Sequence, residues 1–581
     1  MTTARSFTHA LAARFAGSAA DTALLCVDEG GPGSEPQDGG GGTARLTYAE
    51  LDVRARSVAS ALLRHHAAGA PVLVSMGGGP HSVTALLGCL YAGAVAVPVP
   101  PPDDSRAAAE RTAAIAAETD AAIALTESAH APELSRRLAT AGHSSVVCLA
   151  VDSLPDGSAG WEPPAVAGSD IALIQYTSGT TAAPRGVQVT HANLLATMES
   201  LRTALGTGRS SRVGGWLPLH HDLGLIGQLL HPLWLGATAV LMPHLLFARA
   251  PLRWLREVAR HGVTVTAAPD SAYARCLAEV TDDDLAGLDL SALRIAVNAS
   301  EPVSSVTVTA FARRFAAAGL RPDALTTGYG LAEATLLVSL GDERPPIPAV
   351  VAADALERGA LGAPVPGRPV RTLVGCGPAT GVTVRIVDPA TSAVLPEGSV
   401  GEIWVRGDAV AAGYWRRPLE TSAAFGCATS GGEYGFLRTG DLGALRDGRL
   451  FLTGRIKDAL LVDGRTLHPQ EAERQLVQSG SPFGSAVVLS APAEREEIVA
   501  IQEIRGAGWS PAQLAGLAER VRGCIQQEFG ADLGGVVLVR PGTVRRTTSG
   551  KVRRSLMRDL YLRGELRPLY ASSSLYTAEG G

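Results

Sequence analysis

The segment YTSGTTAAPRGV, from Tyr176 to Val187, directly continues the apolar run IALIQY (Ile171 to Tyr176). The apolar run predicts a buried strand, and the loop after it is rich in glycine and small hydroxyl residues and leads into a second strand. Such a loop directs several backbone N–H groups and hydroxyls toward one anion, so it predicts a phosphate site. A polar β-turn between two strands is the alternative. The loop lacks the pattern G-x-x-x-x-G-K-[ST], so P-loop NTPase chemistry is not implied.

Strand-like and helical runs alternate on both sides of this loop, over about the first 380 residues. PVLVSM (71–76) and ATAVLM (237–242) are typical of strands, whereas HANLLATMESLRTAL (191–205) and PLRWLREVARHG (251–262) are typical of helices. This alternation favours α/β layers with largely parallel sheets. From Val382 the pattern changes to short β segments, and after Arg455 two strand runs accompany one strong helix, PAQLAGLAERVRGCIQQEFG.

The predicted fold is therefore α/β with two domains. A large N-terminal domain of layered α/β subdomains plus a β subdomain occupies residues 1–456. A small α+β C-terminal domain, residues 457–581, follows it and is joined to it by a hinge.

Composition excludes several classes of function. The chain has 581 residues, is 46% hydrophobic and 18% charged, and carries a net charge of −5 without a basic block, which argues against nucleic-acid binding. Its apolar runs are too short or too interrupted to span a bilayer. The seven cysteines are scattered without a C-x-x-C pair, so neither a zinc site nor a disulfide framework is predicted. We expect a soluble, cytoplasmic protein.

Only two of the 51 basic residues are lysines, Lys457 and Lys551. Arginine is thus the default cation of this chain, and a lysine is expected where a compact, flexible ammonium is needed. Lys457 lies in TGRIKD (453–458) and Lys551 in TTSGK (547–551).

The loop resembles the phosphate loop of the adenylate-forming, or acyl-activating, enzymes, and the resemblance extends from Leu46 to Lys551. The other family motifs follow in the family's order: NASEPV (298–303), GYGLAEAT (328–335), RTGDLG (438–443), GRIKD and TTSGK. The family loop commonly ends Gly-x-Pro-Lys-Gly, and here Ala182 and Arg185 stand in place of the Gly and the Lys. Arginine still binds polyphosphate, in a bidentate manner.

The resemblance implies ATP and Mg²⁺ as cofactors and assigns roles to individual residues. Tyr329 would stack on adenine, Glu333 would hold magnesium, and Asp441 would bind the ribose hydroxyls. Arg455 would contact ribose and phosphate, Lys457 would be the hinge, and Lys551 would bridge the substrate carboxylate and the α-phosphate. The complete predicted ATP site comprises Thr177, Ser178, Gly179, Thr180, Thr181, Arg185, Ser300, Glu301, Pro302, Gly328, Tyr329, Gly330, Asp441 and Arg455.

Three features resemble the fatty acyl-AMP ligase branch of this family. They are the segment GWLPLHHDLGLIGQLLHPLWLGATAVLM (215–242), the signature GCLYAGAVAVPVPPP (88–102) and a long segment of about residues 341–374. In that branch an insertion at this place packs near the small domain and disfavours the closure that uses CoA. Deleting most of residues 341–374 is therefore expected to raise acyl-CoA formation. A surface loop without such a role is the alternative.

The branch implies a carboxylic acid substrate, and as acceptor the phosphopantetheine thiol of an acyl carrier protein. No Asp-Ser-Leu motif follows Lys551, so we expect the carrier to act in trans. His221 is assigned both to catalysis and to the acyl pocket, whose predicted residues are His221, Asp222, Leu225, Gly227, Trp234, Asp270, Ser271 and Thr327.

Three other functions stay open from the sequence. An acyl-CoA ligase is the nearest. A stand-alone amino-acid adenylation enzyme would need an acidic partner for the amine, for which Asp222 or Asp270 is available. A non-catalytic acyl-binding protein of the same fold is disfavoured because both lysines and Glu333 are present.

Overall fold

The structure is a computed structural model that describes residues 6–28, 42–102, 106–155, 158–162, 164–177, 184–342, 345–462, 465–492, 497–546 and 552–577. Of the predicted site residues, Ser178, Gly179, Thr180, Thr181 and Lys551 lie outside the described residues.

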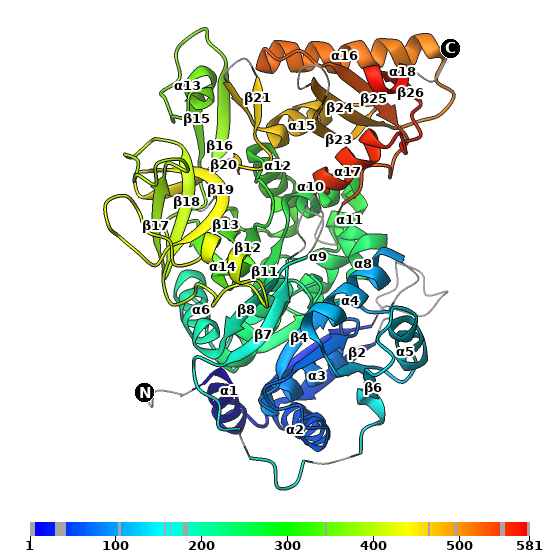
Figure 1. Ribbon diagram of the computed structural model, residues 1–581, viewed down its shortest axis with the longest axis vertical. Helices are drawn as coiled ribbons and strands as arrows, with labels where there is room; N and C mark the ends of the chain where they lie inside the picture. The colour runs from blue at the N-terminus through cyan, green and yellow to red at the C-terminus, as the bar shows by residue number, and fades with distance from the viewer. Residues whose placement is uncertain are drawn as a thin grey trace.

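The predicted phosphate loop follows a strand of a six-stranded sheet (Figure 1). All neighbouring strands are parallel except the last pair, β7 and β8, which the loop connects. The strand order is β6 (Val147–Ala150), β5 (Ile123–Thr126), β3 (Pro71–Ser75), β4 (Val95–Val99), β7 (Ile171–Tyr176) and β8 (Gly186–Thr190). The helices associated with it are α2 (Tyr48–Arg64), α3 (Pro80–Tyr91), α4 (Arg106–Thr119), α5 (Ala131–Thr140) and α6 (His191–Leu205).

A second sheet has eight strands and is parallel except for an antiparallel strand at each edge. Its order is β14 (Leu337–Leu340), β13 (Leu325–Gly330), β12 (Ile295–Asn298), β11 (Val265–Ala268), β9 (Arg212–Gly215), β10 (Thr238–Leu241), β1 (Thr22–Val27) and β2 (Thr43–Thr47). Its helices are α7 (His231–Leu235), α8 (His244–Arg249), α9 (Pro251–Arg260), α10 (Asp270–Glu279), α11 (Asp282–Ala286) and α12 (Ser305–Phe315).

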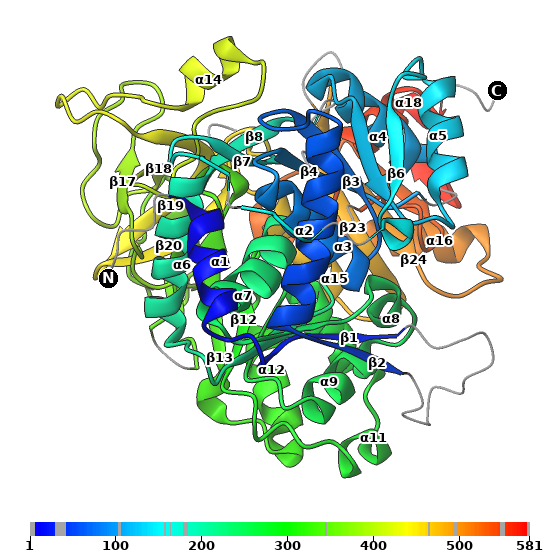
Figure 2. The same ribbon diagram turned by 90° about the horizontal axis from the view of Figure 1, so that it is seen from below.

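The main core lies where helices of the first sheet meet the second sheet (Figure 2). One apolar cluster joins Leu24 of β1, Leu51 of α2, Leu87 of α3 and Val189 of β8, together with helix α1 (Phe7–Ala16). Burying each such leucine contributes about 1.5–3 kcal/mol. The predicted layers of parallel sheets and helices are thereby confirmed.

Local sequence signals fix where the helices begin and end. Thr47 and Glu50 form a capping box at the start of α2, with the Thr47 N–H donating to the Glu50 carboxylate at 2.7 Å. At the C-terminal end of α6, Gly206 adopts φ 58°, a left-handed conformation that ends a helix at little cost when the residue is glycine.

The short β segments after Val382 form a separate antiparallel sheet, β17 (Thr383–Val387), β18 (Gly401–Arg406), β19 (Leu437–Arg446) and β20 (Arg449–Arg455), beside helix α14 (Pro418–Ala424). The segment 341–374 contains a two-stranded hairpin, β15 (Pro348–Ala352) and β16 (Val370–Val374), with helix α13 (Ala353–Glu357). Its apolar residues Val351, Leu356 and Leu373 pack on Ala444 and Phe451 of the antiparallel sheet.

Residues 457–577, here called the C-terminal region, contain a hairpin and a four-stranded sheet with its own apolar clusters. Its elements are β21 (Leu460–Val462), β22 (Arg465–Leu467), α15 (Pro469–Gln478), β23 (Phe483–Ala491), β24 (Glu497–Ile504), α16 (Pro511–Phe529), β25 (Gly535–Val539), α17 (Arg554–Leu562), β26 (Tyr570–Ser572) and α18 (Ser574–Thr577). The division at residue 456/457 stays a prediction. No helix in the described part of the chain is long and apolar enough to cross a bilayer.

The hairpin of segment 341–374 contacts the C-terminal region through Arg371. This side chain is only 13% exposed; it donates to the carbonyl oxygen of Glu528 and lies 3.8 Å from the Glu471 carboxylate. Its guanidinium stands 4.5 Å above the Phe529 ring. Helix α13 packs against β22 as well, so the segment contacts this region at two places.

Candidate active site

A cleft of about 1290 Å³, including its part open to solvent, is lined by residues of the two large sheets, the antiparallel sheet and the C-terminal region. Nine of the predicted site residues line it, although they are spread over 281 positions of sequence: Thr177, Arg185, His221, Asp222, Ser300, Gly330, Glu333, Arg455 and Lys457. The structure therefore brings the motif residues together.

The two ends of the predicted phosphate loop are held by main-chain and side-chain hydrogen bonds. The Thr177 N–H donates to the Arg185 carbonyl at 3.0 Å. Arg111, on α4, donates from Nη2 to the carbonyl oxygens of Tyr176 and Thr177 at 3.3 and 3.1 Å. Arg111 thus anchors the first residue of the loop, and no sequence motif had singled it out.

Glu333 is held by a tyrosine that the sequence analysis missed. The Tyr414 hydroxyl donates to Glu333 Oε1 at 2.9 Å, and the Arg185 guanidinium lies 4.6 Å above the Tyr414 ring. Burial and the nearby Glu333 charge raise the pKa of Tyr414, so it remains a donor at neutral pH. Tyr414 reaches this place because it bridges Val187 of β8.

Asp441 is buried and bonded on both carboxylate oxygens. Tyr329 donates to Oδ2 at 2.7 Å, and Arg455 Nε lies 2.7 Å from Oδ1. The Asp441 charge raises the pKa of Arg455, while burial and the same charge raise that of Tyr329. Tyr329 therefore positions Asp441, a role beyond the predicted contact with adenine.

The stretch LHHD, residues 219–222, contributes to the cleft and is hydrogen-bonded to the first sheet. Gln175 donates to the His220 carbonyl at 2.6 Å, and the Asp222 carboxylate accepts the Leu223 N–H at 2.7 Å, at the start of the π-helical segment Leu223–Leu230. A Cβ on Gly224 would lie 2.3 Å from the Pro218 carbonyl oxygen, so glycine is required at this close approach. Burial lowers the pKa of His220 to about 3, so that ring is neutral at pH 7.

Two cleft residues have a tightly constrained backbone. Ser300 adopts φ 71°, a left-handed conformation uncommon for residues other than glycine and often found at functional sites. A Cβ on Gly330 would meet the Leu336 carbonyl oxygen at 1.7 Å. Both positions belong to predicted nucleotide motifs.

Several predicted residues do not line this cleft. Asp270, assigned to the acyl pocket, accepts bonds from Asn298, the Ser304 N–H and Thr307 at the start of α12. The exposed Ser271 donates its N–H to Glu301, which fixes the Glu301 side chain near α10. The other predicted residues outside the lining are Leu225, Gly227, Gly328, Tyr329, Asp441, Trp234, Pro302 and Thr327.

Two of these are held in the interior, and a third packs against a histidine ring. Leu225 is 1% exposed in the main core, and Thr327 is fully buried with its hydroxyl on the Gly375 carbonyl. The partly buried Trp234 stacks on His231, whose Nε2 bonds Thr207 at 2.8 Å.

The residues on either side of Lys457 are bonded to different parts of the structure. Arg455 is bonded to Asp441 of β19, whereas Asp458 accepts from Arg554 at 2.7 Å. Arg554 also pairs with Glu473 at 2.8 Å and is almost buried. Ile456 and Lys457 therefore connect a residue fixed to the antiparallel sheet with one fixed to α17.

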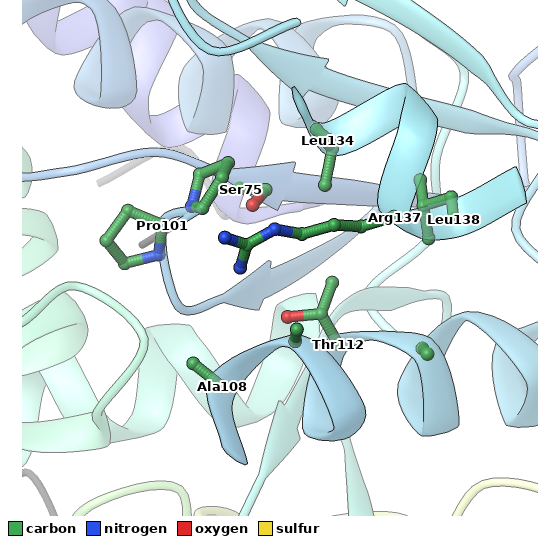
Figure 3. A pocket seen from close by; sticks show the side chains of 10 residues that line it. Ser75, Pro101, Ala108, Thr112, Leu134, Arg137 and Leu138 are labelled. Carbon is green, nitrogen blue, oxygen red and sulfur yellow. The ribbon is translucent and has the colours of Figure 1, made fainter. Parts of the chain in front are cut away.

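A second hollow lies at the carboxyl ends of β3 and β4, between α4 and α5 (Figure 3). The Arg137 side chain extends across it toward Pro101 and bonds Glu133. None of the predicted site residues lines it.

Comparison with known proteins identifies the family of this chain. Residues 18–415 match the family described as AMP-binding enzyme. A medium-chain-fatty-acid–[acyl-carrier-protein] ligase, JamA of Moorena producens, is 36% identical over 90% of this chain and 90% of its own length. A fatty acyl-adenylate ligase structure from a study of the E. coli and L. pneumophila enzymes superimposes with a TM-score of 0.85, at 29% identity over 97% of this chain and 98% of that one. The L. pneumophila ligase in complex with acyl adenylate and pyrophosphate gives a TM-score of 0.75, at 28% identity over 98% of both chains.

The fold and the similar proteins are those of an ATP-using, acid-adenylating ligase. The chain belongs to the AMP-binding enzyme family, and its resemblance to the fatty acyl-AMP ligases is confirmed.

Proposed function

We propose that this enzyme activates a fatty or other acyl acid with ATP to acyl-AMP and pyrophosphate, in the cytoplasm. It then transfers the acyl group to the phosphopantetheine thiol of an acyl carrier protein in trans. The observation that carries the proposal is the convergence of Thr177, Arg185, Glu333, Arg455 and Lys457 on one cleft, where the buried Asp441 holds Arg455.

The reaction brings two anions together, since a carboxylate oxygen must attack the α-phosphorus of ATP. Cations in the cleft offset this repulsion and stabilise the charge of the transition state. Arg185 and Lys457 line the cleft, and Lys551 is the proposed bridge between carboxylate and α-phosphate. Adenylation requires no proton transfer, so we assign no base.

The acidic residues of the cleft fit Mg²⁺ held mainly by substrate. Magnesium is usually bound by one or two carboxylates together with substrate phosphates. Glu333 supplies such a carboxylate, and no group of three or more ligating side chains occurs among the described residues. Bound there, the ion would neutralise phosphate charge; Tyr414 would keep the Glu333 carboxylate oriented.

The amino-acid alternative loses support from the two candidate aspartates. Asp270 accepts three bonds within the protein, and Asp222 caps the segment that follows it. The Arg371 contact would restrain the C-terminal region, and this favours a carrier protein over CoA as the acceptor.

The test is an ATP–pyrophosphate exchange panel with fatty acids of increasing chain length and with amino acids. The best acid is then offered with CoA and with a holo carrier protein, and the acyl thioesters are quantified. Exchange with fatty acids and loading of the carrier are expected. Exchange only with amino acids, or none at all, would overturn the proposal.

Asp441→Asn is expected to raise the KM for ATP about tenfold with little change in kcat. The carboxylate would contact ribose in both ground and transition states, so its loss weakens binding uniformly. Initial rates against ATP concentration measure the effect. Asp447→Asn, an exposed position on the turn between β19 and β20, is the matched control. An unchanged KM for ATP would remove Asp441 from the nucleotide site.

Tyr414→Phe is expected to raise the Mg²⁺ concentration for half-maximal adenylation about three- to tenfold. The substitution removes one hydrogen bond to Glu333, worth about 0.5–1.5 kcal/mol, and leaves the ring under Arg185 in place. Tyr434→Phe is the control because Tyr434 is 76% exposed. An identical magnesium dependence in the variant and the wild type would contradict the positioning role.

A further inference from the structure

Gln175 is a polar residue in the otherwise apolar strand β7. It is 2% exposed and lines the cleft, and the sequence motifs assign it no role. Its Oε1 atom is buried and accepts no hydrogen bond within the described part of the chain. An apolar side chain would fill this interior position without leaving an acceptor unpaired, so packing alone does not explain a glutamine here.

The amide nitrogen of Gln175 fixes one peptide plane of the LHHD stretch. Nε2 donates to the His220 carbonyl oxygen at 2.6 Å. The N–H of the same plane belongs to His221 and donates to the Pro218 carbonyl at 3.1 Å. In the next plane, the His221 carbonyl accepts the Leu225 N–H at 2.8 Å. With both planes beside its Cα bonded in this way, the direction in which the His221 side chain leaves the backbone is set.

Of these three bonds, the one from Gln175 comes from a different sheet. Pro218 and Leu225 belong to the same stretch of chain as His221, whereas Gln175 is 45 residues from His220 and lies in β7 of the first sheet. The end of β7 is itself held, because Arg111 donates to the carbonyl oxygen of Thr177 at 3.1 Å. Gln175 therefore sets the position of the LHHD stretch relative to the strand that leads into the phosphate loop.

The orientation of this stretch bears on the acid substrate. His221 and Asp222, both predicted to contact the acid, line the cleft. A carboxylate that attacks the α-phosphorus must be aligned with the bond that breaks, and a misplacement of about 1 Å costs up to about a hundredfold in rate. A bond that fixes the backbone of His221 against β7 thus acts on the alignment of the acid with the nucleotide.

We propose that Gln175 is a positioning residue for the acid substrate: by holding the His220–His221 peptide plane against β7, it keeps the His221 side chain where the carboxylate binds. The inference rests on the proposed function. Gln175 acts through His221 and not on the nucleotide, so its loss should weaken use of the acid and leave use of ATP nearly unchanged.

The first experiment compares Gln175→Met with the wild type by initial rates of ATP–pyrophosphate exchange, with the acid that the wild type uses best. Methionine has a similar length but donates no hydrogen bond, so the His220 carbonyl loses its partner. We expect the KM for the acid to rise about tenfold and the KM for ATP to stay within about twofold of the wild type. Gln478→Met is the matched control, since Gln478 is exposed at the end of α15, and it should change neither value.

Two outcomes would overturn the inference. One is an unchanged KM for the acid in Gln175→Met. The other is a parallel rise of both KM values, which would indicate a general displacement of β7 and its loop. Wild-type enzyme that exchanges with no acid would instead overturn the proposed function, so the two failures are distinguishable.

The second experiment uses Gln175→Glu, whose carboxyl group donates to the His220 carbonyl only while it is protonated. Burial raises the pKa of a carboxyl group, so lowering the pH from about 8 to about 6 should raise kcat/KM for the acid, relative to the wild type, about threefold or more. Gln175→Met has no group that titrates at this position, so its ratio to the wild type should not depend on pH. The titratable and charged groups near this position are the same in all three proteins and cancel in the ratio: Arg111, Arg185, His220, His221, Asp222 and Lys457.

A ratio for Gln175→Glu that is as flat as that of Gln175→Met would show that donation to His220 is not what the glutamine contributes. Thermal unfolding of each variant is followed over the same pH range. Should Gln175→Met fail to fold, the pH dependence of Gln175→Glu decides the question alone, because a purely structural defect would not be relieved by protonating one carboxyl group.

Discussion

Replacing Lys551 by alanine is expected to lower acyl-adenylate formation by about two to three orders of magnitude, as for the loss of a preorganised electrostatic stabiliser. The reason is the charge of the reaction: Lys551 would neutralise the carboxylate and the α-phosphate as they approach. Arginine, the default cation of this chain, is bulkier and planar, so a lysine at this position indicates a need for a compact ammonium. The measurement is single-turnover formation of acyl-AMP from ATP and acid.

The same variant should unfold at nearly the wild-type temperature. The flanking chain is fixed independently by the bridge of Arg546 with Val552 and by the bond from Arg553 to Arg545. Transfer from preformed acyl-AMP to the thiol should also persist, because the lysine acts only in the first half-reaction. Arg545→Ala, an exposed neighbour, is the control. Unchanged adenylation in Lys551→Ala would show that the TTSGK assignment is wrong.

The backbone arrangement was predictable because it depends on local patterns. The run IALIQY forms β7, and the helix expected at residues 191–205 is α6 with the same bounds. Hydrophobic periodicity and capping residues determine such elements within a few turns of chain. The parallel layers then follow from the alternation of strands and helices.

Side-chain partners were much less predictable. Tyr414 and Glu333 are 81 residues apart, and Tyr329 and Asp441 are 112 apart, so no spacing in the sequence indicates either pair. A motif fixes where a residue lies along the chain, whereas packing decides where its side chain points. Asp270 illustrates this: it follows a strand end as expected, yet its carboxylate is bonded to α12 and its surroundings.

The ion pairs on either side of Lys457 give a physical reason for a hinge at this position. Removing one partner of a buried ion pair typically costs about 3–5 kcal/mol, so the Asp458–Arg554–Glu473 group does not separate easily. On the other side, the buried Asp441 holds Arg455, whose side chain is 46% exposed. Rotation of the C-terminal region that preserves both groups must occur at Ile456 and Lys457. Lys457 has no pairing partner among the described residues that would oppose this.

Arg371→Ala is expected to raise acyl-CoA formation about tenfold while leaving acyl-AMP formation within twofold of the wild type. A bias of about 3 kcal/mol toward one orientation would suppress the other roughly a hundredfold, and the contacts of Arg371 would supply a part of that bias. Its guanidinium links the β15–β16 hairpin to Glu471, Glu528 and Phe529 of the C-terminal region. The ratio of acyl-CoA to acyl-carrier product, measured at equal enzyme concentration, reports the effect.

The point substitution is a sharper test than deletion of segment 341–374. Deletion would uncover Ala444 and Phe451, on which the hairpin packs, and the exposed apolar surface would itself perturb the fold. Arg368→Ala provides the matched control, since Arg368 belongs to the same segment but is 65% exposed and pairs with Asp354 of that segment. A carrier protein is large enough to contact both regions and so to offset the bias, whereas free CoA is not. Carrier loading should therefore change little in Arg371→Ala. If the wild type already forms acyl-CoA as fast as it loads the carrier, the restraint does not select the acceptor, and the enzyme is an acyl-CoA ligase.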